Sequence, residues 1–182
     1  MKTPICFLRQ WSGMLFKMLV VICLTSSCSK TEDPKVEPLT ACTSKNMNAY
    51  IDDQHYNLNV FFTGSKTSIC GYLEFRQATD NAQFIHFDVW VHNLEPNTNY
   101  KLQRAVDTML DGNCTGTDWL TLGKGTNSYS ITTDGKGEGF GELYRSITAI
   151  PVGSKFDIRF QIVKESDSSV ALTSDCYLYT VR

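Results

Sequence analysis

Three side chains that commonly bind metals lie an even number of residues apart in one short stretch of the chain: His86, Asp88 and His92. The stretch, residues 83–92, alternates apolar and polar residues, and a period of two predicts a half-buried β-strand. Its polar residues and Trp90 would share one face of the strand. Side chains at every second position lie roughly 7 Å apart on such a face. Histidine and aspartate are good ligands for zinc and copper, so this face could hold a metal.

The same face could instead bind an organic ligand or a protein. Trp90, with Tyr72 on a neighbouring strand, offers a flat apolar surface of the kind used for sugar stacking or for a protein partner. We therefore predict a binding face for a glycan or an envelope protein, made of Trp90, Tyr72, His86, Asp88, His92 and Arg76. The alternative is that the exposed aromatic side chains only pack across strands and bind nothing.

A histidine pair on one strand of a β-protein resembles the copper–zinc superoxide dismutases. The resemblance implies a metal-binding or dismutase-like enzyme as an alternative function. The chain has only three histidines, His55, His86 and His92, which is fewer than such copper and zinc sites use. It also lacks a Gly-x-Ser-x-Gly motif for a nucleophile. We therefore expect a non-enzymatic binding module with no catalytic residue, metal or cofactor.

Short alternating segments separated by turns indicate the elements that carry these residues. The alternation is clear in residues 69–77, 83–92 and 156–163, and no stretch shows an apolar stripe with the helical period of 3.6. Eight or nine such strands predict an all-β fold, an antiparallel β-sandwich of Greek-key, immunoglobulin-like type.

One turn has a more specific signature. Residues 94–100, Leu-Glu-Pro-Asn-Thr-Asn-Tyr, resemble the turn before a late strand in fibronectin type III domains. Pro96 sets the backbone of the turn, and Tyr100 offers a ring to bury and a hydroxyl that can bond nearby backbone. More chain follows Tyr100 than such a domain would have left, so only the turn and an immunoglobulin-like character are carried over.

The first 27 residues have the order of a secretory signal: three basic and no acidic residues, a short apolar run, and then small residues. The apolar run, residues 18–24, is far shorter than the roughly 20 residues of a membrane-spanning helix. Translation could start at Met1 or at Met14. We predict a cleaved leader, residues 1–27.

The end of the leader, Leu-Thr-Ser-Ser-Cys at residues 24–28, resembles a bacterial lipobox. The resemblance implies lipidation of Cys28, and an outer-membrane destination because Ser29 rather than aspartate follows. Residues 28–41 are polar and contain Pro34 and Pro38, a composition that predicts a flexible tether. The chain would then be anchored to the outer membrane, at its periplasmic or its outer surface, by its lipid.

Four cysteines remain for the predicted domain, residues 42–182. An even number in an exported chain favours two disulfides, with three connectivities. Of these we choose Cys42–Cys70 and Cys114–Cys176, because they tie the start of the domain to an early strand and a long loop to the last strand. The 17 basic and 19 acidic residues of the chain are scattered, which excludes the clustered basic surface of a nucleic-acid-binding protein.

Overall fold

A computed structural model of the chain describes Cys42 and residues 56–77 and 83–182. The predicted leader 1–27, the lipidation site Cys28 and the tether 28–41 lie outside the described residues. The described residues belong to one compact unit, Pro38–Arg182. Within them, no helix is long and apolar enough to cross a membrane.

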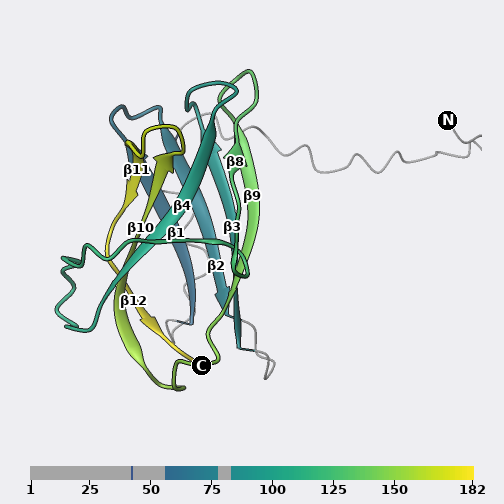
Figure 1. The fold of residues 1–182 in the computed structure, drawn as a ribbon. Helices are drawn as coiled ribbons and strands as arrows, with labels where there is room; N and C mark the ends of the chain where they lie inside the picture. The colour runs from purple at the N-terminus through teal and green to yellow at the C-terminus, as the bar shows by residue number, and fades with distance from the viewer. Residues whose placement is uncertain (1–41, 43–55, 78–82) are drawn as a thin grey trace, which may run out of the picture. The chain divides into compact units, whose positions relative to one another are not determined.

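The described residues form β-strands and no helix, and every strand belongs to one sheet (Figure 1). The twelve strands are β1 (Asn57–Gly64), β2 (Cys70–Gln77), β3 (Phe84–His92), β4 (Asn99–Asp107), β5 (Leu120–Thr121), β6 (Gly123–Lys124), β7 (Asn127–Ser128), β8 (Ile131–Thr132), β9 (Gly139–Ser146), β10 (Lys155–Lys164), β11 (Val170–Ser174) and β12 (Tyr177–Thr180). Eight of them have four or more residues and four have only two.

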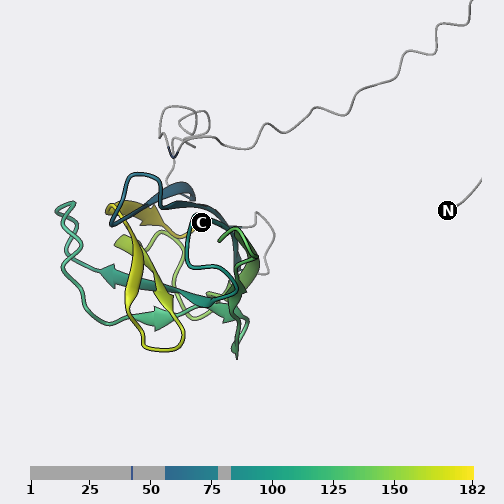
Figure 2. The same cartoon turned by 90° about the horizontal axis from the view of Figure 1, so that it is seen from above.

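The predicted all-β class is confirmed, but the sheet is not divided as an immunoglobulin-like sandwich is. Its strand order is β5-β4-β10-β11-β1-β2-β3-β9-β6-β7, with β12 beside β10 and β8 beside β4. All pairs are antiparallel except one parallel bridge between β6 and β9. Two separate antiparallel sheets were expected, whereas the strands continue around a common interior as a mixed sheet that is nearly a barrel (Figure 2).

The barrel is completed by a short crossing segment and not by long strands. We call the gap between β4 and β9, crossed by residues 120–133, the seam. At one side of the seam Thr121 pairs with Gln103 of β4, and at the other the amide of Gly125 donates to the carbonyl of Tyr144 in β9. A two-residue strand can bridge the gap here because it needs only one or two backbone hydrogen bonds on each side.

Buried side chains fill the seam between these few hydrogen bonds. Leu122 and Ile131, both from the crossing residues, are 1% and 0% exposed. Gly141 of β9 lets Ile131 approach closely, because a Cβ built on this glycine would lie 2.8 Å from the Ile131 side chain. Apolar packing therefore holds the two sides of the seam together, whereas backbone hydrogen bonds between strands hold the rest of the sheet together.

The core lies on the inner face of the long strands. Its centre is an aromatic group in which the Phe75 ring lies 5.4 Å from Phe87, 6.1 Å from Phe160 and 4.8 Å from Tyr179. All three contacts are edge-to-face, an arrangement that aromatic rings favour. The alternation predicted for residues 83–92 is present, since Ile85, Phe87, Val89 and Val91 are buried and the residues between them are not.

The turn before β4 has the predicted tyrosine corner. Tyr100 is 1% exposed, and its hydroxyl accepts a hydrogen bond of 3.1 Å from the amide of Glu95. The buried Thr133 hydroxyl also donates to the carbonyl of Glu95 and so ties the corner to the seam. The corner resembles that of immunoglobulin-like domains, although the sheet around it is continuous.

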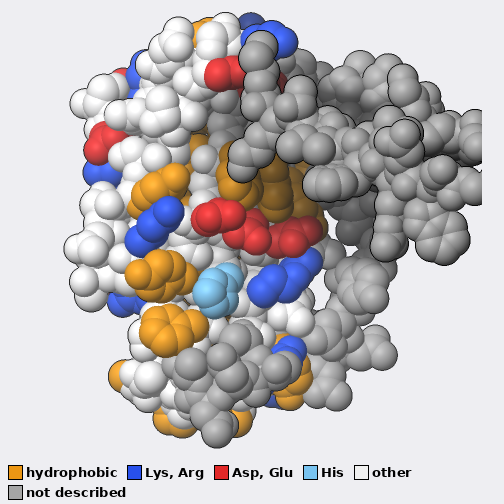
Figure 3. All heavy atoms as spheres, turned by 90° about the vertical axis from the view of Figure 1, so that its right-hand side faces the viewer, with side chains coloured by type: hydrophobic (Ala, Val, Ile, Leu, Met, Phe, Trp, Pro, Cys, Tyr) orange, Lys and Arg blue, Asp and Glu red, His pale blue; other side chains and the backbone are white. Residues whose placement is uncertain are grey.

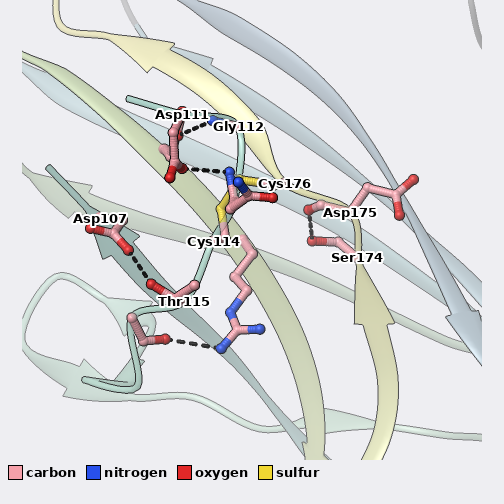
Figure 4. Close-up of a disulfide and its surroundings, with 12 residues drawn as sticks. Asp107, Asp111, Gly112, Cys114, Thr115, Ser174, Asp175 and Cys176 are labelled. Carbon is pink, nitrogen blue, oxygen red and sulfur yellow. Dashed lines mark hydrogen bonds between the residues drawn. A yellow bond between two sulfur atoms is a disulfide. The ribbon is translucent and has the colours of Figure 1, made fainter. Parts of the chain in front are cut away.

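Both disulfides have the pairing chosen from the sequence, Cys42–Cys70 and Cys114–Cys176. The second joins the long loop after β4 to the chain before β12 (Figure 4). In that loop Asp111 accepts a hydrogen bond from the amide of Asn113, and Asp107 accepts one from the Thr115 hydroxyl. These aspartates stabilise turns by accepting hydrogen bonds within the loop, as short polar side chains commonly do.

Candidate functional site

The predicted binding residues lie on the outer face of β2 and β3, and the structure adds β9 to them. In an antiparallel sheet, residues directly opposite each other point to the same face. The register therefore builds three parallel rows, each with one residue from every strand. The rows are Tyr72–Trp90–Phe140, Glu74–Asp88–Glu142 and Arg76–His86–Tyr144. We call them the aromatic, the acidic and the basic row, and the three together the outer face.

The aromatic row is a continuous series of rings. Tyr72 and Trp90 are stacked with their centroids 5.7 Å apart, and Trp90 and Phe140 follow at 5.0 Å with an interplanar angle of 38°. Phe140 ends the row and is 46% exposed. A large part of this hydrophobic side chain is therefore in contact with water.

The acidic row places three carboxylates on adjacent strands (Figure 3). Burial raises the pKa of Asp88 above its ordinary value of 3.8, and the charges of Glu142 and Glu74 raise it further. Like charges directly opposite each other in a sheet are destabilising. The long ion pair between Arg76 and Glu74, 3.7 Å, offsets this repulsion at one end only.

The basic row is partly committed to the fold. Arg76 donates to the Leu58 carbonyl at 2.9 Å and to the Asn59 side chain at 2.6 Å, so it joins β2 to β1. His86 is exposed, and its ring lies 6.4 Å from Tyr144, which is 39% exposed. Along this face the acidic side chains form a band, with hydrophobic side chains on one side of it and the histidine with basic and further hydrophobic side chains on the other (Figure 3).

His92 lies apart from this group. It is on the same side of β3 as His86, but six residues along a strand separate their backbones by roughly 20 Å. Its Nδ1 contacts a carboxylate oxygen of Glu138, whose other oxygen accepts the amide of Asn93. His92 therefore belongs to the turn at the end of β3, and the six predicted residues do not form one cluster.

The three residues considered above as possible metal ligands are not brought together either. Among residues 42, 56–77 and 83–182, no group of three or more His, Cys, Asp or Glu side chains is arranged to hold a metal ion. His86, Asp88 and His92 fail because an extended strand spreads its side chains along its length. The dismutase-like alternative thus has no ligand set in the described part of the chain.

Four of the nine residues of the outer face were not in the predicted binding set. Phe140, Glu142 and Tyr144 all come from β9, and Glu74 comes from β2. The alternation of Gly139–Ser146 could have indicated which β9 side chains point outward. It could not have indicated that β9 pairs with β3, because nearly fifty residues separate the two strands.

Comparison of the chain with models of known protein families, with curated proteins and with solved structures finds no match. Function must therefore be argued from the geometry of the outer face and of the interior.

Proposed function

We propose that the chain is an exported, non-enzymatic binding protein whose outer face takes a carbohydrate. The observation that carries the proposal is the aromatic row, which ends in the half-exposed Phe140 and lies beside the acidic row. Apolar C–H faces of sugars stack on aromatic rings, and sugar hydroxyls donate hydrogen bonds to carboxylates. The outer face offers both groups side by side.

The dimensions of a sheet suit such a ligand. Neighbouring rows lie roughly 7 Å apart along the strands, and each row of three residues extends about 10 Å across them. A sugar on Phe140 and Trp90 would have its polar edge over Glu142 and Asp88. Acceptors held on adjacent strands need no reorganisation to receive several hydroxyl groups, which favours binding.

The loss of stability that the acidic row causes supports the same proposal. Three carboxylates in register lower the stability of the sheet, and among the described residues only Glu74 of the three forms an ion pair, with Arg76. A ligand that donates hydrogen bonds to these carboxylates would offset the repulsion. The rows would then be used in binding rather than in folding.

The proposed location rests on the leader and on the disulfides. Disulfides persist in oxidising compartments outside the cytosol, and the lipobox-like residues before Cys28 imply a lipid anchor. We propose that the tether 28–41 holds the domain at the outer membrane. Replacing the anchor residue, Cys28→Ser, should move the protein from the membrane fraction to the soluble fraction; a variant that stays in the membrane fraction would remove the anchor from the proposal.

The binding proposal is tested with a panel of immobilised polysaccharides and with calorimetry on the hits. The mature chain carrying Cys28→Ser is compared with the same chain carrying Phe140→Ala. We expect binding by the first and a loss of affinity of about tenfold or more in the second, which is the effect of removing a central aromatic contact. Since Phe140 is half exposed, its replacement should leave folding intact.

A matched control is Trp119→Ala, which removes an aromatic side chain far from the outer face, where Trp119 packs under Arg159. It should bind as the parent protein does. Equal binding by the Phe140→Ala protein would move the site away from the outer face. Failure to bind any polysaccharide would leave an envelope protein as the partner of this face.

A further inference from the structure

An apolar pocket lies at one end of the interior, opposite in character to the outer face. The cavity volume is about 90 Å³, which is enough for a short hydrocarbon group and well below the roughly 300–1,000 Å³ of sites for drug-sized ligands. Strands β2, β3, β4, β10 and β12 all contribute to it. Its apolar lining includes Phe75, Phe87, Val106, Ile147, Phe156 and Ile158.

Two arginines, Arg104 and Arg145, also line this pocket. Arg104 shares the inner side of β4 with the buried Tyr100 and Leu102, and Arg145 shares the inner side of β9 with Leu143. At these positions strand alternation requires a side chain that points inward. In the described residues β4 and β9 do not pair with each other, so the arginines lie on the two strands that border the seam.

Neither arginine is neutralised by the fold. Among the described residues, Arg104 and Arg145 have no ion pair and no hydrogen bond, whereas Arg76 and Arg159 each donate to a backbone carbonyl. Burial lowers the pKa of Arg104, and the positive charge of Arg145 lowers it further. The pocket therefore holds two half-buried like charges that cost stability unless an anion joins them.

The other described residues of the lining do not supply that anion. Among them Tyr179 is the one with a polar side chain, and its hydroxyl already donates to Gln77 at 2.8 Å. No aspartate or glutamate is among the described lining residues. Guanidinium groups bind carboxylates strongly, often through two parallel hydrogen bonds, and the apolar walls favour a hydrocarbon group.

We propose that this pocket binds a small amphiphilic carboxylate, with its carboxylate between Arg104 and Arg145 and its apolar tail among the core side chains. This second site is independent of the outer face. It gives the protein a carrier or sensor capacity for an organic acid, in addition to surface binding.

The test compares butanoate with butan-1-ol, which has the same number of carbons and no charge, by calorimetry on the mature chain carrying Cys28→Ser. Butanoate should bind about tenfold more tightly, the ratio that one charge-assisted interaction gives. Arg104→Met and Arg145→Met should each abolish this ratio and leave butanol binding unchanged. Arg76→Met, which removes the same charge from the outer face, should change neither ligand's affinity.

Methyl chemical shifts locate the ligand without any substitution in the pocket. Butanoate should shift the methyl signals of Ile147, Ile150 and Ile158, which line the pocket, and not that of Ile69, which does not. Equal affinity for butanoate and butanol, no binding of either, or shifts confined to other isoleucines would each overturn the proposal. Polysaccharide binding by the Arg104→Met protein should equal that of its parent. The failure of one proposal can therefore be distinguished from the failure of the other.

Discussion

Two regions of the barrel are held together in different ways. One is the wall formed by β1, β2, β3 and β9, whose long strands pair in unbroken register over seven or eight residues each. The other is the seam, where the crossing residues make only a few backbone hydrogen bonds with β4 and β9. Backbone pairing organises the wall, whereas buried side chains and a disulfide at the entry to the crossing segment organise the seam.

The difference bears on both proposed sites. Regular pairing in the wall aligns like residues of three strands into rows, which makes an ordered outer surface. The seam interrupts pairing between β4 and β9, and two inward arginines remain there without a partner among the described residues. A surface ligand would therefore use the wall, and an interior ligand would use the border of the seam.

The largest expected effect comes from removing the disulfide that precedes the seam. The double substitution Cys114→Ser/Cys176→Ser opens a loop with a sequence separation of 62 residues, and loop-closure entropy gives a loss of about 4 kcal/mol in the free energy of unfolding. Urea denaturation measures it. The same substitution at Cys42 and Cys70, separated by 28 residues, should cost slightly less. A loss below about 1 kcal/mol at Cys114–Cys176 would mean that the seam closes without it.

The next effect tests whether side chains close the seam. Leu122→Ala should lower the free energy of unfolding by about 3 kcal/mol, because it leaves a cavity at a fully buried site. Leu73→Ala, at an equally buried site in the wall, is the matched control and should cost a similar amount. Hydrogen exchange should distinguish the two variants, because the amides of Gly125 and Thr133 should exchange faster only in the Leu122→Ala protein. A cost far below that of the control would show that packing in the seam is dispensable.

The smallest effect concerns the acidic row of the wall. Asp88→Asn should raise the free energy of unfolding by about 0.5 kcal/mol at neutral pH, since it relieves repulsion between opposite strands. The pKa of Asp88 is raised in the folded protein, so the native state holds this proton more tightly than the unfolded chain does. Stability therefore falls as pH rises from the ordinary pKa of 3.8 through the raised value, and the gain from Asp88→Asn should appear over that window.

Denaturation of both proteins between pH 3 and pH 7 measures this gain. Asp118→Asn, at an exposed aspartate outside the row, controls for the loss of one charge. A gain that does not depend on pH, or an equal gain from Asp118→Asn, would argue against repulsion within the row.

Local sequence patterns predicted much of the wall. Alternation marked the inner and outer residues of β3 correctly, because side chains of a strand point to opposite faces at every step. The Tyr100 corner was predicted from a short motif, and two disulfides were predicted from the number of cysteines, with the pairing chosen among three connectivities. The seam was not predicted, because its two-residue strands are too short to show a period.

By itself, the sequence determined the β-class, the outward position of Trp90, Asp88 and His86, and an even number of cysteines that favours two disulfides, whereas the structure decided which of the three pairings forms. Only the tertiary structure decided that β9 lies beside β3, which adds Phe140 and Glu142 to the candidate site, and that the strands continue into a nearly closed barrel. It also decided that Arg104 and Arg145 line the same pocket. The physical reason is that alternation is local to one strand, whereas strand neighbours are chosen by the packing of the whole core.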